Sequence, residues 1–130
     1  MSKVIGHKWW RPVGINRVVD HGGNIPARHR RLFEKLASVD GRCIEEDDHP
    51  HAALCHWRII TNLSPIDLEL LILQDGFQKS GSFPIEDGDT DYNDHDYGSE
   101  GLCYSDPDID DCHAVWWIAQ IGSTVFLHDC

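Results

Sequence analysis

The segment 86–111 holds the densest group of side chains that could do chemistry. It reads EDGDTDYNDHDYGSEGLCYSDPDIDD and contains 11 carboxylates but no Lys or Arg. Several of its aspartates follow one another at i, i+2 spacing, so in extended backbone they lie on one side of the chain about 6.8 Å apart. Such a row of like charges favours contact with a surface rich in Lys and Arg. The residues predicted to bind such a partner are Asp87, Asp89, Asp91, Asp94, Asp96, Asp108, Asp110 and Asp111, with Tyr92 and Tyr97 as aromatic anchors.

The same segment matches part of a calcium-binding loop. The ligand positions of an EF-hand register would be filled by Asp89, Asp91, Asn93, His95, Tyr97 and Glu100. Two features contradict the match. The sixth position, which needs glycine for a sharp turn, is Asp94, and the flanks FPIEDG and GLCYSD lack a helical pattern. We therefore predict no EF-hand, and an irregular cation site stays open as an alternative because oxygen ligands are abundant.

Histidines and cysteines form a second group with the chemistry of metal ligands. Residues 49–56 follow the pattern H-x-H-x3-C-H, and an upstream thiol and the C-terminal part could add Cys43, Cys112, His113, His128 and Cys130. The sequence has no C-x2-C pair, and a strand at 54–61 would direct Cys55 and His56 to opposite faces. Structural zinc is therefore not favoured, and no cofactor is predicted.

Motifs of common catalytic sites are missing from the sequence. It has no G-x-S-x-G, no H-E-x-x-H and no phosphate-binding glycine loop. Cys55-His56 and Cys112-His113 place thiols beside imidazoles, but sequence neighbours seldom meet as nucleophile and base. We predict a protein that is not an enzyme, with a metal-dependent or cysteine-based enzyme as the alternative.

The charge is divided unequally between the two halves of the chain. The formal net charge of the 130 residues is -11. Residues 1–60 carry 10 basic and 7 acidic side chains, whereas residues 61–130 carry one basic and 15 acidic side chains. This imbalance disfavours nucleic acid or an anionic membrane as a direct partner and favours a basic protein or nucleoprotein surface.

Cysteine usage and hydropathy indicate the compartment. Five cysteines at irregular spacing do not form a disulfide framework, so we expect free thiols in a reducing cytoplasm. The N-terminus lacks the apolar core of a signal peptide, and no apolar run approaches the ~18 residues of a membrane span.

Local patterns predict a small α+β fold that forms a single domain over residues 1–130. A strand within residues 3–19 is expected to end at Val18 and Val19. Helices are expected at about 26–39 and 65–75, a central half-buried strand near 54–61, and a C-terminal β-hairpin at 114–128 around Gly122-Ser123. The stretch 86–111 is predicted to be one long acidic loop. The run IDLELLILQ is apolar almost all round, which predicts a helix buried on more than one side.

Two smaller patterns bear on the surface. Trp9 and Trp10 lie between Lys8 and Arg11, and we expect one tryptophan in the core and the other covering it rather than an exposed docking patch. The basic side chains of the 26–39 helix are expected on a solvated face, where they could screen the acidic half of the chain.

By size, acidity and lack of catalytic motifs, the chain resembles the small single-domain inhibitors of phages and mobile elements, such as anti-CRISPR and anti-restriction proteins. The resemblance implies a cytoplasmic protein that inhibits a nucleic-acid-handling partner by occupying its basic surface. Nucleic-acid mimicry is one form that such binding could take. A bacterial immunity protein that neutralises a basic toxin is the alternative within the binding proteins.

Overall fold

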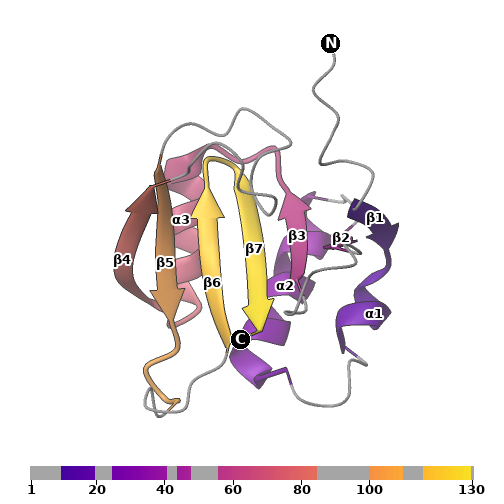
Figure 1. The fold of residues 1–130 in the computed structure, drawn as a ribbon, viewed down its shortest axis with the longest axis horizontal. Helices are drawn as coiled ribbons and strands as arrows, with labels where there is room; N and C mark the ends of the chain where they lie inside the picture. The colour runs from indigo at the N-terminus through magenta and orange to yellow at the C-terminus, as the bar shows by residue number, and fades with distance from the viewer. Residues whose placement is uncertain are drawn as a thin grey trace.

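The computed structural model describes residues 10–19, 25–40, 44–47, 56–84, 100–109 and 116–129, and within them seven strands form one antiparallel sheet (Figure 1). The order across the sheet is β1-β2-β3-β7-β6-β5-β4, and three helices belong to the same described part. The elements are β1 (Trp10–Val13), α1 (Ile15–Val19), α2 (Ala27–Asp40), β2 (Ile44–Asp47), β3 (His56–Ile60), α3 (Pro65–Gln74), β4 (Gln78–Pro84), β5 (Glu100–Ser105), β6 (Trp116–Ile121) and β7 (Thr124–Asp129).

The sheet consists of two runs of sequential neighbours that meet in the middle. Strands β1, β2 and β3 are adjacent, and α3 then carries the chain to β4 at the far edge. From there β4, β5, β6 and β7 return strand by strand, until β7 pairs antiparallel with β3. The middle strand is therefore β7, and the predicted central strand β3 is its interior neighbour.

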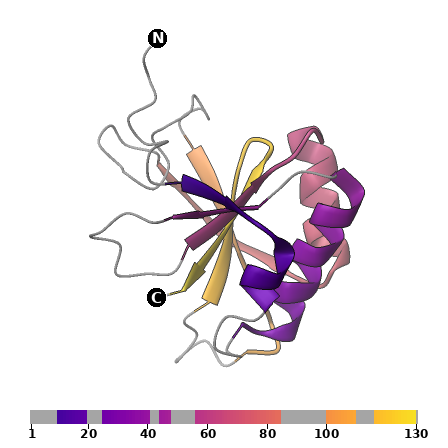
Figure 2. The same cartoon turned by 90° about the vertical axis from the view of Figure 1, so that its right-hand side faces the viewer.

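Helices α2 and α3 cover one face of this sheet (Figure 2). The main core lies between these helices and the sheet, because inward side chains of β3, β6 and β7 meet the buried faces of both helices. Alternation along the strands puts a second cluster on the opposite face, formed by Trp10, Ala119, Ile121 and Phe126. The interior strands are thus covered on both faces, so the prediction that 54–61 is half-buried was wrong: Trp57, Arg58 and Ile59 are all buried.

Helix α2 begins one residue after its predicted start. The carbonyl of Pro26 accepts the first helical bond from the Arg30 N–H at 3.0 Å. Apolar residues at helical spacing form its inner face, and Leu32, Phe33 and Leu36 are fully buried. His29 lies on that same inner face and is also buried, which the apolar pattern did not indicate.

Helix α3 has the caps that its sequence predicts. Ser64 is extended at the N-cap and its Oγ accepts from the Asp67 N–H at 3.2 Å, while Pro65 occupies the first turn. The helix ends where Gly76 takes φ +101°, a conformation that favours glycine. Buried Gln120 of β6 donates to the Pro65 carbonyl at 2.8 Å, which fixes the start of α3 against the sheet.

The C-terminal hairpin agrees with its prediction. Strands β6 and β7 pair in register across Gly122-Ser123, and Ile121 faces Thr124. Gly122 has φ +59°, and no non-glycine residue of the described part has positive φ. Positive φ at the first central residue alone is the pattern of a type II′ turn, as predicted.

Strands β2, β4 and β5 and helix α1 were not predicted. The N-terminal strand expected to end at Val18 and Val19 was wrong there, because β1 ends at Val13 and Ile15–Val19 form α1. Residues 100–105 form β5, so the expected single acidic loop over 86–111 is wrong. Strands β1, β2 and β4 and the short helix α1 also lack a strong local pattern. The edge strand β4 reads QKSGSFP, and its described side chains are exposed, so its pairing with β5 rather than an apolar stripe defines it. None of the described helices is long and apolar enough to cross a lipid bilayer.

Candidate binding surface

Strand β5 divides the acidic segment into two connections. The connection before β5 comprises residues 85–99, and its ends are held together because Pro84 pairs with Glu100 across β4 and β5. The connection after β5 begins at Asp106. Six residues of antiparallel strand span about 17 Å, so the two acidic groups start from opposite ends of β5. The i, i+2 rows of aspartates before and after β5 are therefore separated by this strand.

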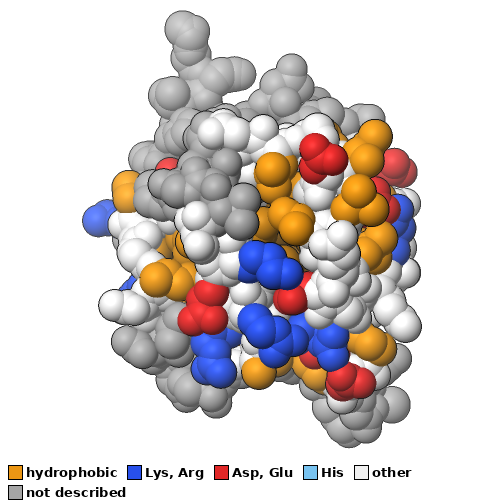
Figure 3. Space-filling view, turned by 180° about the vertical axis from the view of Figure 1, so that it is seen from behind, with side chains coloured by type: hydrophobic (Ala, Val, Ile, Leu, Met, Phe, Trp, Pro, Cys, Tyr) orange, Lys and Arg blue, Asp and Glu red, His pale blue; other side chains and the backbone are white. Residues whose placement is uncertain are grey.

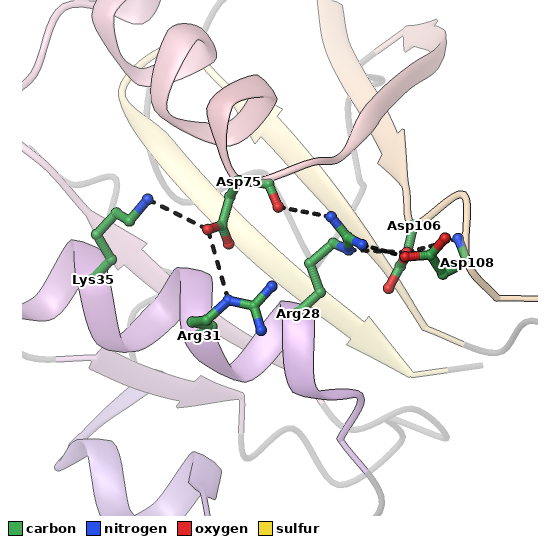
Figure 4. Close-up of polar contacts among 6 residues, drawn as sticks. All are labelled: Arg28, Arg31, Lys35, Asp75, Asp106 and Asp108. Carbon is green, nitrogen blue, oxygen red and sulfur yellow. Dashed lines mark hydrogen bonds and ion pairs between the residues drawn. The ribbon is translucent and has the colours of Figure 1, made fainter.

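The acidic group after β5 is tied to α2 through Arg28 (Figure 4). The Arg28 Nε lies 3.0 Å from Asp106 Oδ1, and the guanidinium also pairs with Asp108. A third contact joins α2 to the end of α3, because Arg28 Nη1 donates to the Asp75 carbonyl at 2.9 Å. We call Arg28, Asp106 and Asp108 the arginine cluster. It connects α2, the residues after α3 and the turn after β5.

The two carboxylates of the arginine cluster lie in different environments. The Asp106 side chain is 7% exposed, whereas that of Asp108 is 75% exposed. Asp106 Oδ1 also accepts from the Asp108 N–H at 2.9 Å, and the Ile109 N–H donates to the Asp106 carbonyl at 3.2 Å. These bonds form an Asx-type turn that holds Asp106 against Arg28.

Further basic residues of α2 face the end of α3. Lys35 Nζ lies 3.3 Å and Arg31 Nε 3.9 Å from Asp75 Oδ1 (Figure 4). The expectation that basic side chains of this helix screen the acidic half is therefore confirmed for Asp75, Asp106 and Asp108. Of the predicted partner-binding residues, Asp108 is the one that the structure describes, and it is engaged in this internal pair.

Most of the predicted partner-binding residues belong to the acidic connections on either side of β5. Nine of the ten lie outside the described residues: Asp87, Asp89, Asp91, Asp94, Asp96, Tyr92, Tyr97, Asp110 and Asp111. The structure fixes only the ends of the connection that carries seven of them. Both ends are strands, because Phe83 belongs to β4 and Glu100 to β5, so the helical flanks of an EF-hand are absent there.

The predicted zinc ligands are largely outside the described part as well. Cys43, His49, His51, Cys55, Cys112, His113 and Cys130 are not described, and neither is the side chain of His56. His128 is described and is buried, with its ring stacked on Trp117 at 4.1 Å between centroids. No group of three potential metal ligands occurs among the described residues. Cys103 is a free thiol whose pKa is raised by burial.

On the inner face of α2, His29 is a buried histidine that the sequence analysis did not single out. Its ring contacts Phe77 edge-on at 5.0 Å, and its nitrogens make no hydrogen bond of good geometry, although the Trp116 backbone lies near enough to favour the protonated ring. Burial lowers the pKa of His29 to about 4, and the nearby Asp106 carboxylate offsets this only in part. The side chain is therefore neutral at pH 7 and is part of the core.

On the opposite face of the sheet, Trp10 packs as predicted for one tryptophan of the N-terminal pair. It is 5% exposed and meets Phe126 edge-on at 5.9 Å. The guanidinium of buried Arg58 lies 4.1 Å from the Trp10 ring centroid, and Arg58 Nε donates to Glu45 Oε1 at 2.7 Å. Trp9 lies outside the described residues.

Helix α3 exposes apolar side chains that were predicted to be buried. Ile66, Leu70 and Leu73 are 72%, 51% and 39% exposed. Leu68 and Ile72 alone are fully buried on this helix, so the prediction of burial on more than one side was wrong. Figure 3 shows hydrophobic side chains on the helix-bearing face beside a group of Lys and Arg. Nothing in the sequence distinguished exposed from buried apolar positions here, because they alternate within one apolar run.

Comparison with known proteins gives no relative: no protein-family model, no curated protein and no solved structure matches this chain.

Proposed function

We propose that this protein is a small acidic binding protein that inhibits a nucleic-acid-handling partner by occupying the partner's basic surface. It would act in the manner of anti-CRISPR or anti-restriction proteins of phages and mobile elements. The binding element is the connection 85–99, which carries Asp87, Asp89, Asp91, Asp94 and Asp96, with Tyr92 and Tyr97 as anchors.

The distribution of formal charge along the chain supports this proposal. The described residues carry 8 basic and 12 acidic side chains, for a net charge of -4, and the remaining residues carry 3 basic and 10 acidic, for -7. Six of those ten carboxylates belong to the connection 85–99, which contains no Lys or Arg. The basic residues of α2 already contact Asp75, Asp106 and Asp108. The formal negative charge outside the described residues is therefore densest before β5.

The position of the connection also supports a role in binding. It joins β4, an edge strand, to β5, and the paired ends limit how far its two halves can separate. Both ends of this connection are anchored in paired strands, so the chain that carries these charges begins and ends at one place in the sheet. After β5, Asp106 and Asp108 hold Arg28. Asp110 and Asp111 lie outside the described residues and remain predicted binding residues.

The test compares the wild type with a variant in which Asp87, Asp89, Asp91, Asp94 and Asp96 are Asn. Both tagged proteins are used to retain partners from a bacterial host extract at low and high salt. The retained complex is then assayed for its nuclease or nucleic-acid-binding activity with added purified protein. We expect the wild type to retain and inhibit a Lys- and Arg-rich complex. The variant should bind this complex at least about a hundredfold more weakly, and high salt should weaken binding of the wild type.

A matched pair of double variants controls for net charge. Asp91→Asn/Asp94→Asn and Glu34→Gln/Glu46→Gln each remove two negative charges, but only the first pair lies in the connection. The first should weaken inhibition and the second should not. Equal affinity for all variants would exclude the connection from binding. A basic toxin as the retained and neutralised partner would support the immunity-protein alternative.

A further inference from the structure

The exposed apolar side chains of α3 form a continuous stripe. Ile66, Leu70 and Leu73, which we call the α3 stripe, follow one another at spacings of four and three residues, so they lie on one face of the helix. They are the only exposed large hydrophobic side chains among the described residues. Apolar side chains gathered on a single exposed helical face mark an interaction surface more often than side chains scattered singly.

The helix presents this stripe from a fixed position. Leu68 and Ile72 on its inner face are fully buried in the main core. Its first turn is fastened to the sheet, because Gln120 Nε2 donates to the Pro65 carbonyl at 2.8 Å and Ser123 Oγ donates to the Leu63 carbonyl at 2.6 Å. The stripe therefore does not need to become ordered on binding, which lowers the entropic cost of docking.

The spacing of the stripe suits an antiparallel copy of itself. With a rise of about 1.5 Å per residue, Ile66 lies about 6.0 Å to one side of Leu70 and Leu73 about 4.5 Å to the other. A two-fold axis through Leu70 would therefore place Ile66 opposite Leu73 of a second copy, with an offset of about 1.5 Å. All three side chains would then find an apolar partner at the usual distance between packed helices.

The charges beside the stripe have the same symmetry. Asp67 is exposed near the start of α3, and the structure gives its carboxylate no ion pair among the described residues. Near the end of α3, Arg31 is 55% exposed and is held only by a 3.9 Å contact with Asp75. Asp67 lies about 4.5 Å and Asp75 about 7.5 Å from Leu70 along the helix. In the antiparallel arrangement the positions of Asp67 and Asp75 differ by about 3 Å along the helix axis, and the Arg31 side chain extends from α2 toward Asp75 at that level.

We propose that the α3 stripe is a self-association surface, on which α3 packs antiparallel against α3 of a second copy of this chain. The two-fold axis passes near Leu70, and Asp67 of each copy pairs with Arg31 of the other. This inference does not depend on the proposed inhibitory function, because it uses other residues. The surface is small, so we expect a weak dimer that forms in the micromolar range rather than a permanent one.

The test measures mass against concentration by sedimentation velocity. The experiment runs at about 0.15 M salt, where the ~8 Å screening length limits repulsion between two chains of net charge -11. The wild type should shift from the 14.8 kDa monomer toward twice that mass as concentration rises from micromolar to near-millimolar. Leu70→Glu should remain monomeric. Asn16→Glu, which adds the same charge at an exposed position of α1, should behave like the wild type.

A charge exchange tests the antiparallel pairing itself. Asp67→Arg and Arg31→Asp should each weaken dimerisation at least about fivefold, and the double variant should recover most of the loss because both symmetric pairs are restored with reversed sign. Thermal unfolding of each variant separates misfolding from lost association. A wild type that stays monomeric throughout, or a folded Leu70→Glu variant that still dimerises, would overturn the proposal. A double variant no better than the single variants would exclude the pairing of Asp67 with Arg31.

Discussion

The arginine cluster allows one prediction in which two nearly identical substitutions have different effects. Asp106 and Asp108 are two residues apart and pair with the same Arg28 guanidinium. Asp106→Asn and Asp108→Asn each remove one negative charge beside that guanidinium. The Asp106 side chain is 7% exposed and that of Asp108 is 75% exposed. Leaving a nearly buried polar group without its partner costs about 1–3 kcal/mol, and more for a charged group, whereas an exposed ion pair contributes about 0–1 kcal/mol. We expect Asp106→Asn to lower the free energy of unfolding by about 2 kcal/mol and Asp108→Asn by about 0.5 kcal/mol.

Urea unfolding followed by tryptophan fluorescence measures this difference. With a slope of about 2 kcal/mol per M urea, the midpoint should fall by about 1 M for Asp106→Asn and about 0.3 M for Asp108→Asn. The two variants have the same net charge, so long-range repulsion cancels from the comparison. In 1 M salt the Asp108 effect should vanish while most of the Asp106 effect remains, because buried pairs are screened less. Equal midpoints, or a larger loss for Asp108→Asn, would refute the assigned difference in burial.

Two further predictions concern the same region. Gly76→Ala should lower the free energy of unfolding by at least about 2 kcal/mol, because its Cβ would lie 1.6 Å from Arg28 Nη1 and φ is +101°. Gly81→Ala, which has open space, should cost under about 1 kcal/mol, and similar urea midpoints would contradict this account. The pKa of His29 is lowered from 6.5 to about 4, so the unfolded chain binds the extra proton between these values. The stability from neutral His29 is fully present above pH 6.5 and is lost as pH falls through about 4, by roughly 3 kcal/mol in all. His29→Leu should remove this part of the acid destabilisation, and an unchanged pH profile of unfolding would contradict the assignment.

The elements that the sequence predicted are those with local determinants. Ser64 and Pro65 define the start of α3, and Gly76 defines its end, because capping and positive φ depend on residues within one turn. The hairpin follows from two apolar runs around Gly122 for the same reason. The helices at 27–40 and 65–74 therefore lie within one residue of their expected bounds.

The elements that were missed depend on distant pairing. Strand β4 has an exposed, polar sequence, and β5 has only the short apolar alternation of Leu102 and Tyr104 inside the acidic segment. Each forms a strand because the neighbouring strand supplies hydrogen-bond partners, and that partner is chosen by the whole sheet. The prediction of one long loop over 86–111 was wrong for this reason, since β5 lies within that stretch.

From the sequence alone came the excess of negative charge, the helix limits and the turn of the hairpin, because composition, caps and glycine positions are local properties. The tertiary structure decided which of the described charges pair with one another and which apolar residues face solvent. Arg28 meets Asp106 and Asp108 only because α2 packs beside the turn after β5. Ile66, Leu70 and Leu73 are exposed because the sheet covers just one side of α3. Both outcomes depend on which surfaces meet, and a pattern of residue types along one helix or loop does not contain that information.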